Sequence, residues 1–589
     1  MFSYSQGHRI RHSRDKKAEL SSIDFSEFES FVQHVLSCRK VPGAGIAMVK
    51  DNRVLYTEGF GLADIKSRKK ATRHTKFCIG SLTKAFTSTL LARLLSQKDN
   101  IDWDTPIKDI LKENFRLSDD LRTKHVNLRD VLAHKVGIPE NFHALLVGFS
   151  EDVTREDFVR RLQFIPATKW FRSKFFYSNY MYTLAGYVAE VIGGKNWETL
   201  VQESLLIPLR MHNTGFVDQL DNRNDLASPY VLLNGSLTEV DRQLTLSVHP
   251  AGPAGSIYST PVDMSKWILF HLNRGNDPNG RSIVSEEWLN ETYNVQMPQP
   301  VSSKDLYRPQ FPIDKVVIGY NMGWATSVYR GFRKIWHSGG IVTYTSHLWL
   351  FPEKNIGVFV TFNGPLSDES SYAMEAIISR AADLLLEEEP WMNLTTACSF
   401  PSPWRQAKDP RLPCDEKAHK WNISRSHVDY IGVYGHLAFG NISVSTENEK
   451  ELTLRFGRFG EMNIWPVSET RFHGRYTGSL WFITGSQDNV DPIEIDFVTS
   501  EAGDIDGLLF PVDFKSNKTL FERDLILNSD KKWHIRNSQF KKMKQFTRKL
   551  VNETRPITEK RIDVVKEILR LKVNEVMPMY FHLTVSEVF

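Results

Sequence analysis

The amino-acid sequence predicts an α+β fold in which helices pack on an antiparallel sheet, followed by a small all-β, barrel-like domain. Near the start, Gly43–Val49 and Val54–Gly59 are joined at Asp51-Asn52, which is typical of a hairpin. Further strand-like stretches with short connections follow at 322–329, 332–337, 343–351 and 356–362. Because strands open and close this region, we expect one antiparallel sheet built from both of its ends.

Helical periodicity fills the part between these strands and extends to both flanks. The apolar spacing predicts helices near 25–36, 82–96, 180–192, 261–273 and 373–386. The helix near 261 has a clear start, because Thr260, Pro261 and Asp263 suit the N-cap, N1 and N3 positions. We therefore expect helices flanking the sheet and a mostly helical subdomain beside it.

Changes in composition divide the chain into five segments. Residues 1–24 are polar and are expected to be loose, 25–388 form the sheet-and-helix domain, and 389–424 are a Pro-rich linker. Short alternating stretches predict a β-barrel or sandwich over 425–528, with strands at 442–444, 452–456, 462–466, 480–484, 493–497 and 507–510. Residues 529–589 are predicted to be a basic helical tail.

The net charge of +4 is unevenly distributed. Residues 531–572 hold fourteen Lys and Arg against four Asp and Glu, an excess of +10 that leaves about −6 for the rest. This tail could contact an acidic polymer or matrix, or it could be a solvated helix face. Hydrophobic residues at 41% and charged residues at 24% are ordinary globular values, which exclude a low-complexity chain. We expect no nucleic-acid partner.

Signals for the cellular compartment are mixed. No apolar run approaches the ~18 residues of a membrane span, and the N-terminus has no apolar segment of a signal peptide. A weak excess of glycosylation sequons favours an extracellular, secreted location, with the cytoplasm as the alternative. The sequons begin at Asn234, Asn290, Asn393, Asn422, Asn441, Asn517 and Asn552.

Four cysteines are too few for a disulfide framework. Cys398 and Cys414 flank a Pro-rich stretch, and we expect that they could pair in an oxidising compartment. Cys38 and Cys78 are interpreted as small buried hydrophobic residues.

Ser81 and Lys84 are the first candidates for chemistry. Gly80 precedes them and a helical apolar pattern follows, so the lysine lies one turn after the serine on the same helix face. An unprotonated lysine can activate a serine hydroxyl as a nucleophile. The same Ser-x-x-Lys spacing recurs at Ser13, Ser37, Ser529 and Ser538, so the motif alone is also explained by chance.

Tyr177 and Asn179 form the one Tyr-x-Asn of the chain, just before the helix at 180–192. A loop in this position can present a phenol as a proton carrier and an amide to a substrate carbonyl. The alternative is a packed tyrosine with Asn179 as a helix cap.

His337, Gly339 and Gly340 form the one His-x-Gly, at the end of the predicted strand 332–337. Glycine after an edge strand lets a substrate approach the backbone, and the Gly340 N–H could join the Ser81 N–H in an oxyanion hole. A plain glycine turn is the alternative.

In combination and in this order, the three motifs resemble those of the serine β-lactamase and penicillin-binding protein family, especially the class C-like, esterase-type branch related to the S12 peptidases. The resemblance covers about 25–388 and includes 41–47, 59–61, 128–134, 209–216 and 254–260. It implies the β-lactamase/transpeptidase-like fold, and 430–524 is similar to the small β-domain that follows this domain in eukaryotic and esterase-like members.

The resemblance also implies the roles of the site residues. Ser81 would be the acylated nucleophile, Lys84 its activator and Tyr177 a general base and acid. Asn179, His337, Gly339 and Gly340 would bind substrate.

Two positions depart from the family pattern. His337 stands where lactamases of this branch have a lysine, and a histidine is mostly neutral at pH 7, which favours esterase- or peptidase-like activity over β-lactam hydrolysis. Lys135-Val136 replaces a Thr-Ser pair.

Signatures of other enzymes are missing from the sequence, which contains no Gly-x-Ser-x-Gly, no His-Glu dipeptide and no phosphate loop. We therefore expect no metal and no nucleotide cofactor. The leading hypothesis is a serine hydrolase acting on ester, amide or D-peptide-like substrates. The alternative is a secreted structural or matrix protein that retains the fold with weak or no turnover.

Overall fold

The computed structural model describes residues 24–220, 222, 225–299, 311–313, 315–405, 421, 423–448, 451–484, 491–513 and 518–526. The chain divides into two units, Met1–Leu527 and Asn528–Phe589, and the described residues all belong to the first. The predictions of a basic helical tail with an acidic partner, and of a loose segment before residue 24, lie outside the described residues.

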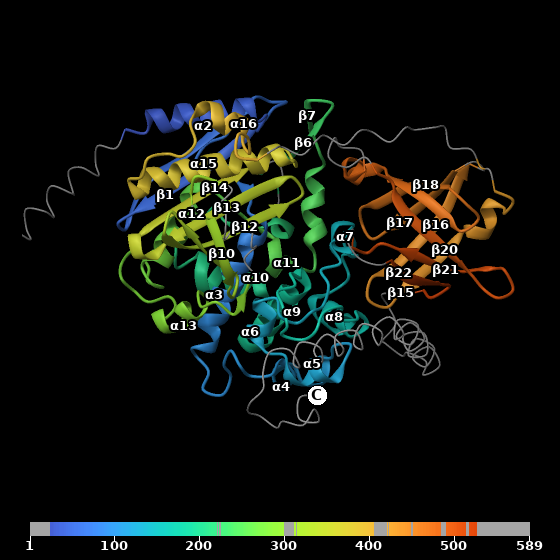
Figure 1. Cartoon of the computed structure of the whole chain (residues 1–589). Helices are drawn as coiled ribbons and strands as arrows, with labels where there is room; N and C mark the ends of the chain where they lie inside the picture. Colours follow the sequence, from blue (N-terminus) through green and yellow to red (C-terminus); the bar gives the residue numbers. More distant parts are fainter. Residues whose placement is uncertain are drawn as a thin grey trace, which may run out of the picture. The chain divides into compact units, whose positions relative to one another are not determined.

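A nine-stranded antiparallel sheet organises the first part of the chain (Figure 1). Its order is β3-β2-β1-β14-β13-β12-β11-β10-β9. Strand β1 (Gly43–Lys50) pairs with β2 (Arg53–Asp64) on one side and with β14 (Ile356–Phe362) on the other. The prediction of one sheet built from both ends of the region is therefore confirmed. The other strands are β3 (Lys69–Lys70), β9 (Met297–Pro298), β10 (Lys315–Tyr320), β11 (Ala325–Tyr329), β12 (Phe332–Ile341) and β13 (Tyr344–Phe351).

Helices cover both faces of this sheet, because β1 and β14 are apolar on both sides. On one face α2 (Ser26–Cys38), α15 (Asp368–Leu386) and α16 (Leu394–Ser399) share a core with alternate strand residues, such as Ile46 and Val358. On the other face α12 (Pro261–Leu272) approaches so closely that a Cβ on Gly357 would lie 2.3 Å from Ile268 Cγ2. The expected cap of α12 is present, since the Thr260 side chain accepts a hydrogen bond from Asp263 N.

A helical subdomain lies between β2 and β9 in the sequence. Its central helix is α9 (Asn179–Gly193), which is buried over most of its length. The other helices are α3 (Thr83–Leu95), α4 (Ile107–Leu111), α5 (Asp120–His125), α6 (Leu128–Leu132), α7 (Phe142–Leu146), α8 (Arg155–Arg161), α10 (Trp197–Val201), α11 (Gly252–Gly255) and α13 (Glu286–Glu291). Two small sheets accompany them, β4-β8-β5 (Phe77–Cys78, Ile257–Ser259, Gly215–Phe216) and β6-β7 (Tyr230–Leu233, Ser236–Glu239).

The second predicted β-region is a closed antiparallel barrel, shown in orange and red in Figure 1. Its strands are β15 (Gly432–His436), β16 (Gly440–Asn448), β17 (Glu451–Phe456), β18 (Gly460–Pro466), β19 (Arg471–Tyr476), β20 (Ile493–Thr499), β21 (Ile505–Phe510) and β22 (Thr519–Arg523). The prediction of a strand at 480–484 is wrong. Gly478–Ile483 is a 3-10 helix that buries Leu480 and Phe482, and two apolar residues spaced by two fit either structure.

Two predicted strand boundaries in the main sheet are also wrong. Residues 321–324 form a turn rather than the start of a strand, with Gly323 at a φ of +83°. Strand β12 does not end at His337 but continues to Ile341. Because β11 pairs only with residues 332–336, the segment from His337 onward lacks a β11 partner along that edge.

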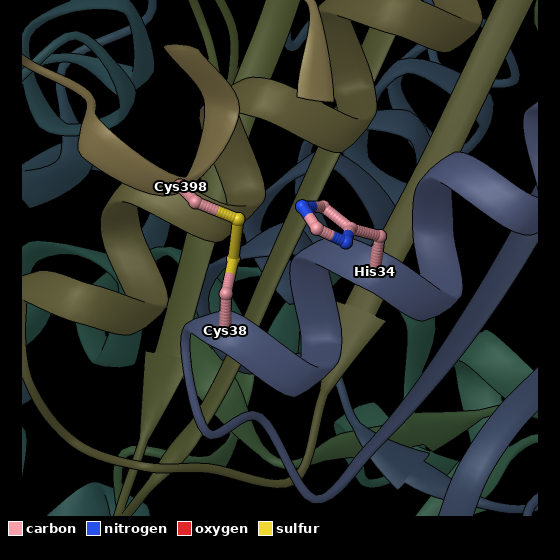
Figure 2. A group of neighbouring side chains, drawn as sticks. All are labelled: His34, Cys38 and Cys398. Carbon is pink, nitrogen blue, oxygen red and sulfur yellow. A yellow bond between two sulfur atoms is a disulfide. The ribbon is translucent and has the colours of Figure 1, made fainter. Parts of the chain in front are cut away.

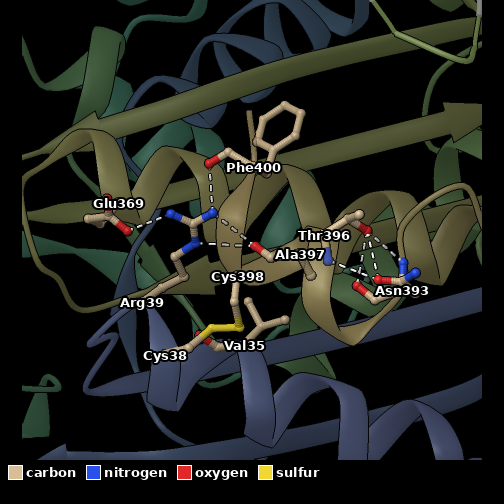
Figure 3. Close-up of a disulfide and its surroundings, with 9 residues drawn as sticks. All are labelled: Val35, Cys38, Arg39, Glu369, Asn393, Thr396, Ala397, Cys398 and Phe400. Atoms are coloured by element: carbon tan, nitrogen blue, oxygen red, sulfur yellow. Dashed lines mark hydrogen bonds and ion pairs between the residues drawn. A yellow bond between two sulfur atoms is a disulfide. The ribbon is translucent and has the colours of Figure 1, made fainter. Parts of the chain in front are cut away.

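A disulfide joins Cys38 at the end of α2 to Cys398 in α16 (Figure 3). The expected pairing of Cys398 with Cys414 is therefore wrong, as is the interpretation of Cys38 as buried. Both cysteines lie where α2 and α16 pack together. Their separation of 360 positions hides this contact in the sequence. Arg39 is bound beside the bridge by the Ala397 and Phe400 carbonyls. Cys78 is a buried free thiol, as predicted.

Among the described residues, no helix is both long enough and apolar enough to cross a lipid bilayer.

Candidate active site

Ser81 lies in a single 3-10 turn, Gly80–Leu82, that leads directly into α3. This turn packs against β12, and two glycines permit the contact. A Cβ on Gly80 would lie 2.6 Å from Gly340 N, and a Cβ on Gly339 would lie 2.0 Å from Ile79 O. Ser346 Oγ ties the turn to the sheet through a 2.7 Å hydrogen bond to Ile79 O. The serine is thereby held beside the glycine segment of β12.

Lys84 Nζ lies 2.9 Å from Ser81 Oγ. The lysine is the second residue of α3, one turn after the serine, and its side chain is completely buried. Its amine is also within 2.6 Å of Asn179 Oδ1 and 2.9 Å of the Ala254 carbonyl. These contacts fix the amine next to the hydroxyl that it would activate.

Burial lowers the pKa of Lys84 from its usual value near 10.5 to about 7, and the charge of Glu140 opposes this decrease. Near neutral pH a large fraction of the lysine is therefore the free amine. A free amine can accept a proton from a serine hydroxyl, whereas an ammonium group cannot.

Tyr177 OH donates a 2.9 Å hydrogen bond to Ser81 Oγ. The tyrosine is two residues before α9, and its ring also faces the Lys84 amine, 4.9 Å from the ring centroid. Burial raises the pKa of Tyr177 well above 10. The phenol is therefore protonated in the free protein and can serve as a proton donor.

Asn179 is the first residue of α9, and its amide connects the amine of Lys84 to the carboxylate of Glu140. Its Oδ1 accepts from Lys84 Nζ, while its Nδ2 donates to Glu140 Oε1 at 2.5 Å. The alternative in which Asn179 caps the helix is not what the structure shows, because Ser178 occupies the N-cap position and makes no side-chain cap.

His337 faces a tyrosine rather than the serine. Its Nε2 is 2.8 Å from Tyr320 OH, and its Nδ1 is 2.5 Å from the Ser338 carbonyl. Burial, followed by the charge of Lys84, lowers the pKa of His337 to about 3, so the imidazole is neutral. Gly339 and Gly340 follow it on the β12 edge, and their backbone lies against the Ser81 turn. All seven predicted residues thus lie around one site.

A family model described as Beta-lactamase matches residues 28–382, which is more than half of the chain. The chain belongs to the beta-lactamase family. The match covers the sheet, the helical subdomain and the three motifs, and it confirms the family resemblance and the fold that the sequence predicts.

The chain is also similar to individual curated proteins, at 29% identity for the two described next. Unguisins hydrolase ungD of Aspergillus violaceofuscus is 29% identical over 347 residues, which is 57% of this chain and 61% of that protein. This chain therefore spans less than two thirds of that relative's length. Gigasin-6 of Magallana gigas is 29% identical over 252 residues, covering 42% of this chain and 82% of that protein.

Among solved structures, the octameric penicillin-binding protein homologue from Pyrococcus abyssi superposes with a TM-score of 0.51. It is 23% identical, and the alignment covers 85% of this chain and all of that one. At this level of identity the likeness concerns the fold.

Three residues at this beta-lactamase-family site were missed by sequence reasoning. His134 packs its ring against Tyr177, at 4.3 Å between centroids, and accepts from Ser178 N through Nδ1. Tyr320 binds His337, and Glu140 binds Asn179. His134 closes the 128–134 stretch that the family resemblance includes, so it had a signal. Glu140 lies in a loop that has no readable sequence pattern, and Tyr320 lies in a strand that the sequence did not predict. The sequence therefore carries no signal for either residue.

One group of potential metal ligands occurs within the described ranges, made of His34, Cys38 and Cys398 (Figure 2). Their ligand atoms all lie within 4.8 Å of one another. The two sulfurs are bonded to each other, so they offer no thiolates to a metal in this state. The three residues come from α2 and α16, and none of them belongs to the three motifs.

Proposed function

We propose that this protein is a serine hydrolase that transfers the acyl group of an ester, amide or D-peptide-like substrate through a covalent acyl-Ser81 intermediate. The observation that carries this proposal is the position of Ser81 Oγ, which is 2.9 Å from both Lys84 Nζ and Tyr177 OH. A nucleophile that contacts a free amine and a protonated phenol has a base and an acid at hand.

In the acylation step, Ser81 Oγ forms a bond to the substrate carbonyl carbon while neutral Lys84 takes the hydroxyl proton. The backbone N–H groups of Ser81 and Gly340 would stabilise the oxyanion. The bond to the leaving group then breaks, and that group departs with the proton of Tyr177. The Lys84 ammonium returns a proton to the phenolate, which restores both side chains.

Deacylation again relays a proton through Lys84. Water attacks the acyl carbon and gives one proton to Lys84. The ester bond to Ser81 breaks, the serine oxygen regains a proton from the lysine, and the carboxylic acid leaves. The enzyme returns to its starting state, and one water is consumed for each bond cleaved.

The neutral state of His337 supports ester and amide substrates over β-lactam drugs. A lysine in the third motif would offer a charge to a drug's carboxylate, whereas a histidine with a pKa of about 3 offers only hydrogen bonds. Efficient β-lactamase activity is therefore not part of this proposal.

The proposal is tested by intact mass spectrometry after treatment with a fluorophosphonate. Wild-type protein should gain one adduct, and peptide mapping should assign it to Ser81. The Ser81→Ala variant should gain none, while Ser96→Ala at the other end of α3 should label like wild type. A folded wild-type protein that stays unlabelled, or labels equally in Ser81→Ala, would contradict the proposal.

We further propose an extracellular or otherwise oxidising location, supported by the bridge between Cys38 and Cys398. Among the sequons, Asn234, Asn290 and Asn393 are exposed, as glycosylation requires. A mass decrease after deglycosylation of the protein purified from its source would support secretion, and unmodified asparagines with reduced thiols would contradict it.

A further inference from the structure

Hydrogen bonds connect the amine of Lys84, through the side-chain amide of Asn179, to the carboxylate of Glu140. Glu140 Oε1 accepts from Asn179 Nδ2 at 2.5 Å, and Asn179 Oδ1 is 2.6 Å from Lys84 Nζ. The two ends of an amide are chemically different, since the nitrogen donates and the oxygen accepts. An acceptor on one side of Asn179 therefore determines that its oxygen, not its nitrogen, faces the amine of Lys84.

Glu140 also acts on Lys84 through its charge. The titratable groups near the amine are the phenols of Tyr177 and Tyr182, the imidazoles of His134 and His337, and the Glu140 carboxylate. Burial holds the pKa of both histidines far below neutrality, so these imidazoles carry no charge there. The negative charge of Glu140 stabilises the ammonium form of Lys84 and opposes the effect of burial.

The barrel holds the segment that follows Glu140. Helix α7 begins two residues later, and its His143 contacts two barrel residues. Nδ1 of His143 is 2.6 Å from the Pro511 carbonyl, and Nε2 contacts the hydroxyl of Tyr476. Burial lowers the pKa of His143 to about 3, so the ring is neutral and suits one donated and one accepted hydrogen bond.

Backbone hydrogen bonds strengthen the same attachment. Ala144 N donates to Val512 O at 3.0 Å, and Phe459 N donates to Val147 O at 2.8 Å. Gly457 and Gly460 allow the barrel turn to come this close, because a Cβ on either would lie within 3 Å of Val147 or Gly148 atoms. Side-chain and backbone contacts thus tie residues 143–148 to the barrel.

We propose that Glu140 is a positioning residue of the acylation site, and that the barrel acts on catalysis by holding the Glu140 segment in place. The proposal rests on the proposed function, because it concerns the orientation and charge state of the base that activates Ser81. It gives the barrel a role in turnover in addition to any role in stability.

Two substitutions separate the hydrogen bond of Glu140 from its charge. Glu140→Gln keeps an acceptor for Asn179 and removes the negative charge that raises the pKa of Lys84. The acidic limb of the pH profile of kcat/KM should therefore shift to lower pH by about 0.5–1 unit. Glu140→Leu removes both, and kcat should fall about tenfold further as the Asn179 amide loses its fixed orientation. If Glu140 had only a structural role, its replacement by glutamine would not shift the pH profile of kcat/KM.

Two tyrosines of the barrel test the second half of the proposal. Tyr476→Phe removes the hydroxyl that contacts His143 and should lower kcat severalfold. Tyr434→Phe is the matched control, because its hydroxyl binds the Tyr430 carbonyl inside the barrel. In a double-mutant cycle, Tyr476→Phe should have little further effect on kcat when Glu140 is already leucine.

The outcomes distinguish this inference from the proposed function. If Ser81 is labelled and turns over substrate, but Glu140→Gln leaves both the limb and kcat unchanged, the positioning role of Glu140 is wrong. If the effects of Tyr476→Phe and Glu140→Leu are additive, the barrel does not act through Glu140. If Ser81 is not acylated at all, the proposed function itself fails. Circular dichroism and melting temperatures identify any variant that fails to fold, and in that case Glu140→Gln alone decides.

Discussion

Tyr177 OH lies 2.9 Å from Ser81 Oγ, although 96 positions separate the two residues in the sequence. Helix α9 begins two residues after the tyrosine and packs against α3, which begins two residues after the serine. The two helices, buried through most of their length, therefore determine the distance between the phenol and the hydroxyl. This contact is available to proton transfer without any rearrangement of the backbone.

Removing the phenol hydroxyl should reduce activity strongly. We expect Tyr177→Phe to lower kcat/KM for p-nitrophenyl esters by about 10²–10⁴-fold, the usual contribution of a positioned acid or base. Tyr182→Phe is the matched control, because this tyrosine is buried, has its ring 5.2 Å from Lys84 Nζ and donates to the Leu132 carbonyl instead. Equal losses in the two variants would show that the Tyr177 hydroxyl has no special role.

The pH dependence of acylation should follow Lys84. Because its pKa is lowered to about 7 and the free amine is the active form, kcat/KM should be half-maximal near pH 7. The rate should fall about tenfold per pH unit below this point and level off above about pH 8. His337 titrates near 3 and does not contribute to this limb. A rate that stays constant between pH 5.5 and 9, with the Ser81→Ala background subtracted, would contradict the role of Lys84.

β-Lactam acylation should not depend on the drug's carboxylate. Since His337 is neutral, benzylpenicillin and its uncharged methyl ester should acylate Ser81 at rates within about threefold of each other. Stopped-flow or mass-resolved time courses with both compounds measure this ratio. A preference of tenfold or more for the free carboxylate would reveal a cationic partner at this site.

Two neighbouring glycines should respond differently to alanine. A Cβ on Gly339 would lie 2.0 Å from Ile79 O and 2.6 Å from Ser346 Oγ, so the strand and the Ser81 turn would be forced apart. We expect Gly339→Ala to cost about 1–3 kcal/mol of unfolding free energy. Gly340→Ala is the control for stability, because its Cβ would meet only Tyr344 O, at 3.9 Å. Denaturant melts compare the two, and equal stability would show that the turn and β12 are not in close contact.

The bridge between Cys38 and Cys398 should stabilise the fold, because it closes a loop of 360 residues. Cys38→Ser should lose about 2–4 kcal/mol, the usual contribution of a disulfide that constrains a long segment of the unfolded chain. Dithiothreitol should lower the melting temperature of wild type and leave that of Cys38→Ser unchanged. If the reductant has no effect on wild type, the bridge contributes nothing to stability.

The amino-acid sequence by itself determined the class of fold and the seven motif residues. Helical and strand periodicity are local, so α12 with its Thr260 cap and the β1–β2 hairpin could be predicted from neighbouring residues. Ser81 and Lys84 could be paired in the same way, since their spacing within one helical turn is a local property.

Only the tertiary structure decided which distant residues complete the site and which cysteine forms the disulfide with Cys398. Glu140, Tyr320 and the partner of Cys398 depend on contacts between segments far apart in the sequence. Residues whose burial alternates by two, such as Leu480 and Phe482, fit a strand and a 3-10 helix equally well until packing selects one. The pKa of Lys84 follows the same rule, because it depends on burial against α9 and α11 and on a carboxylate 56 positions away, which no local pattern encodes.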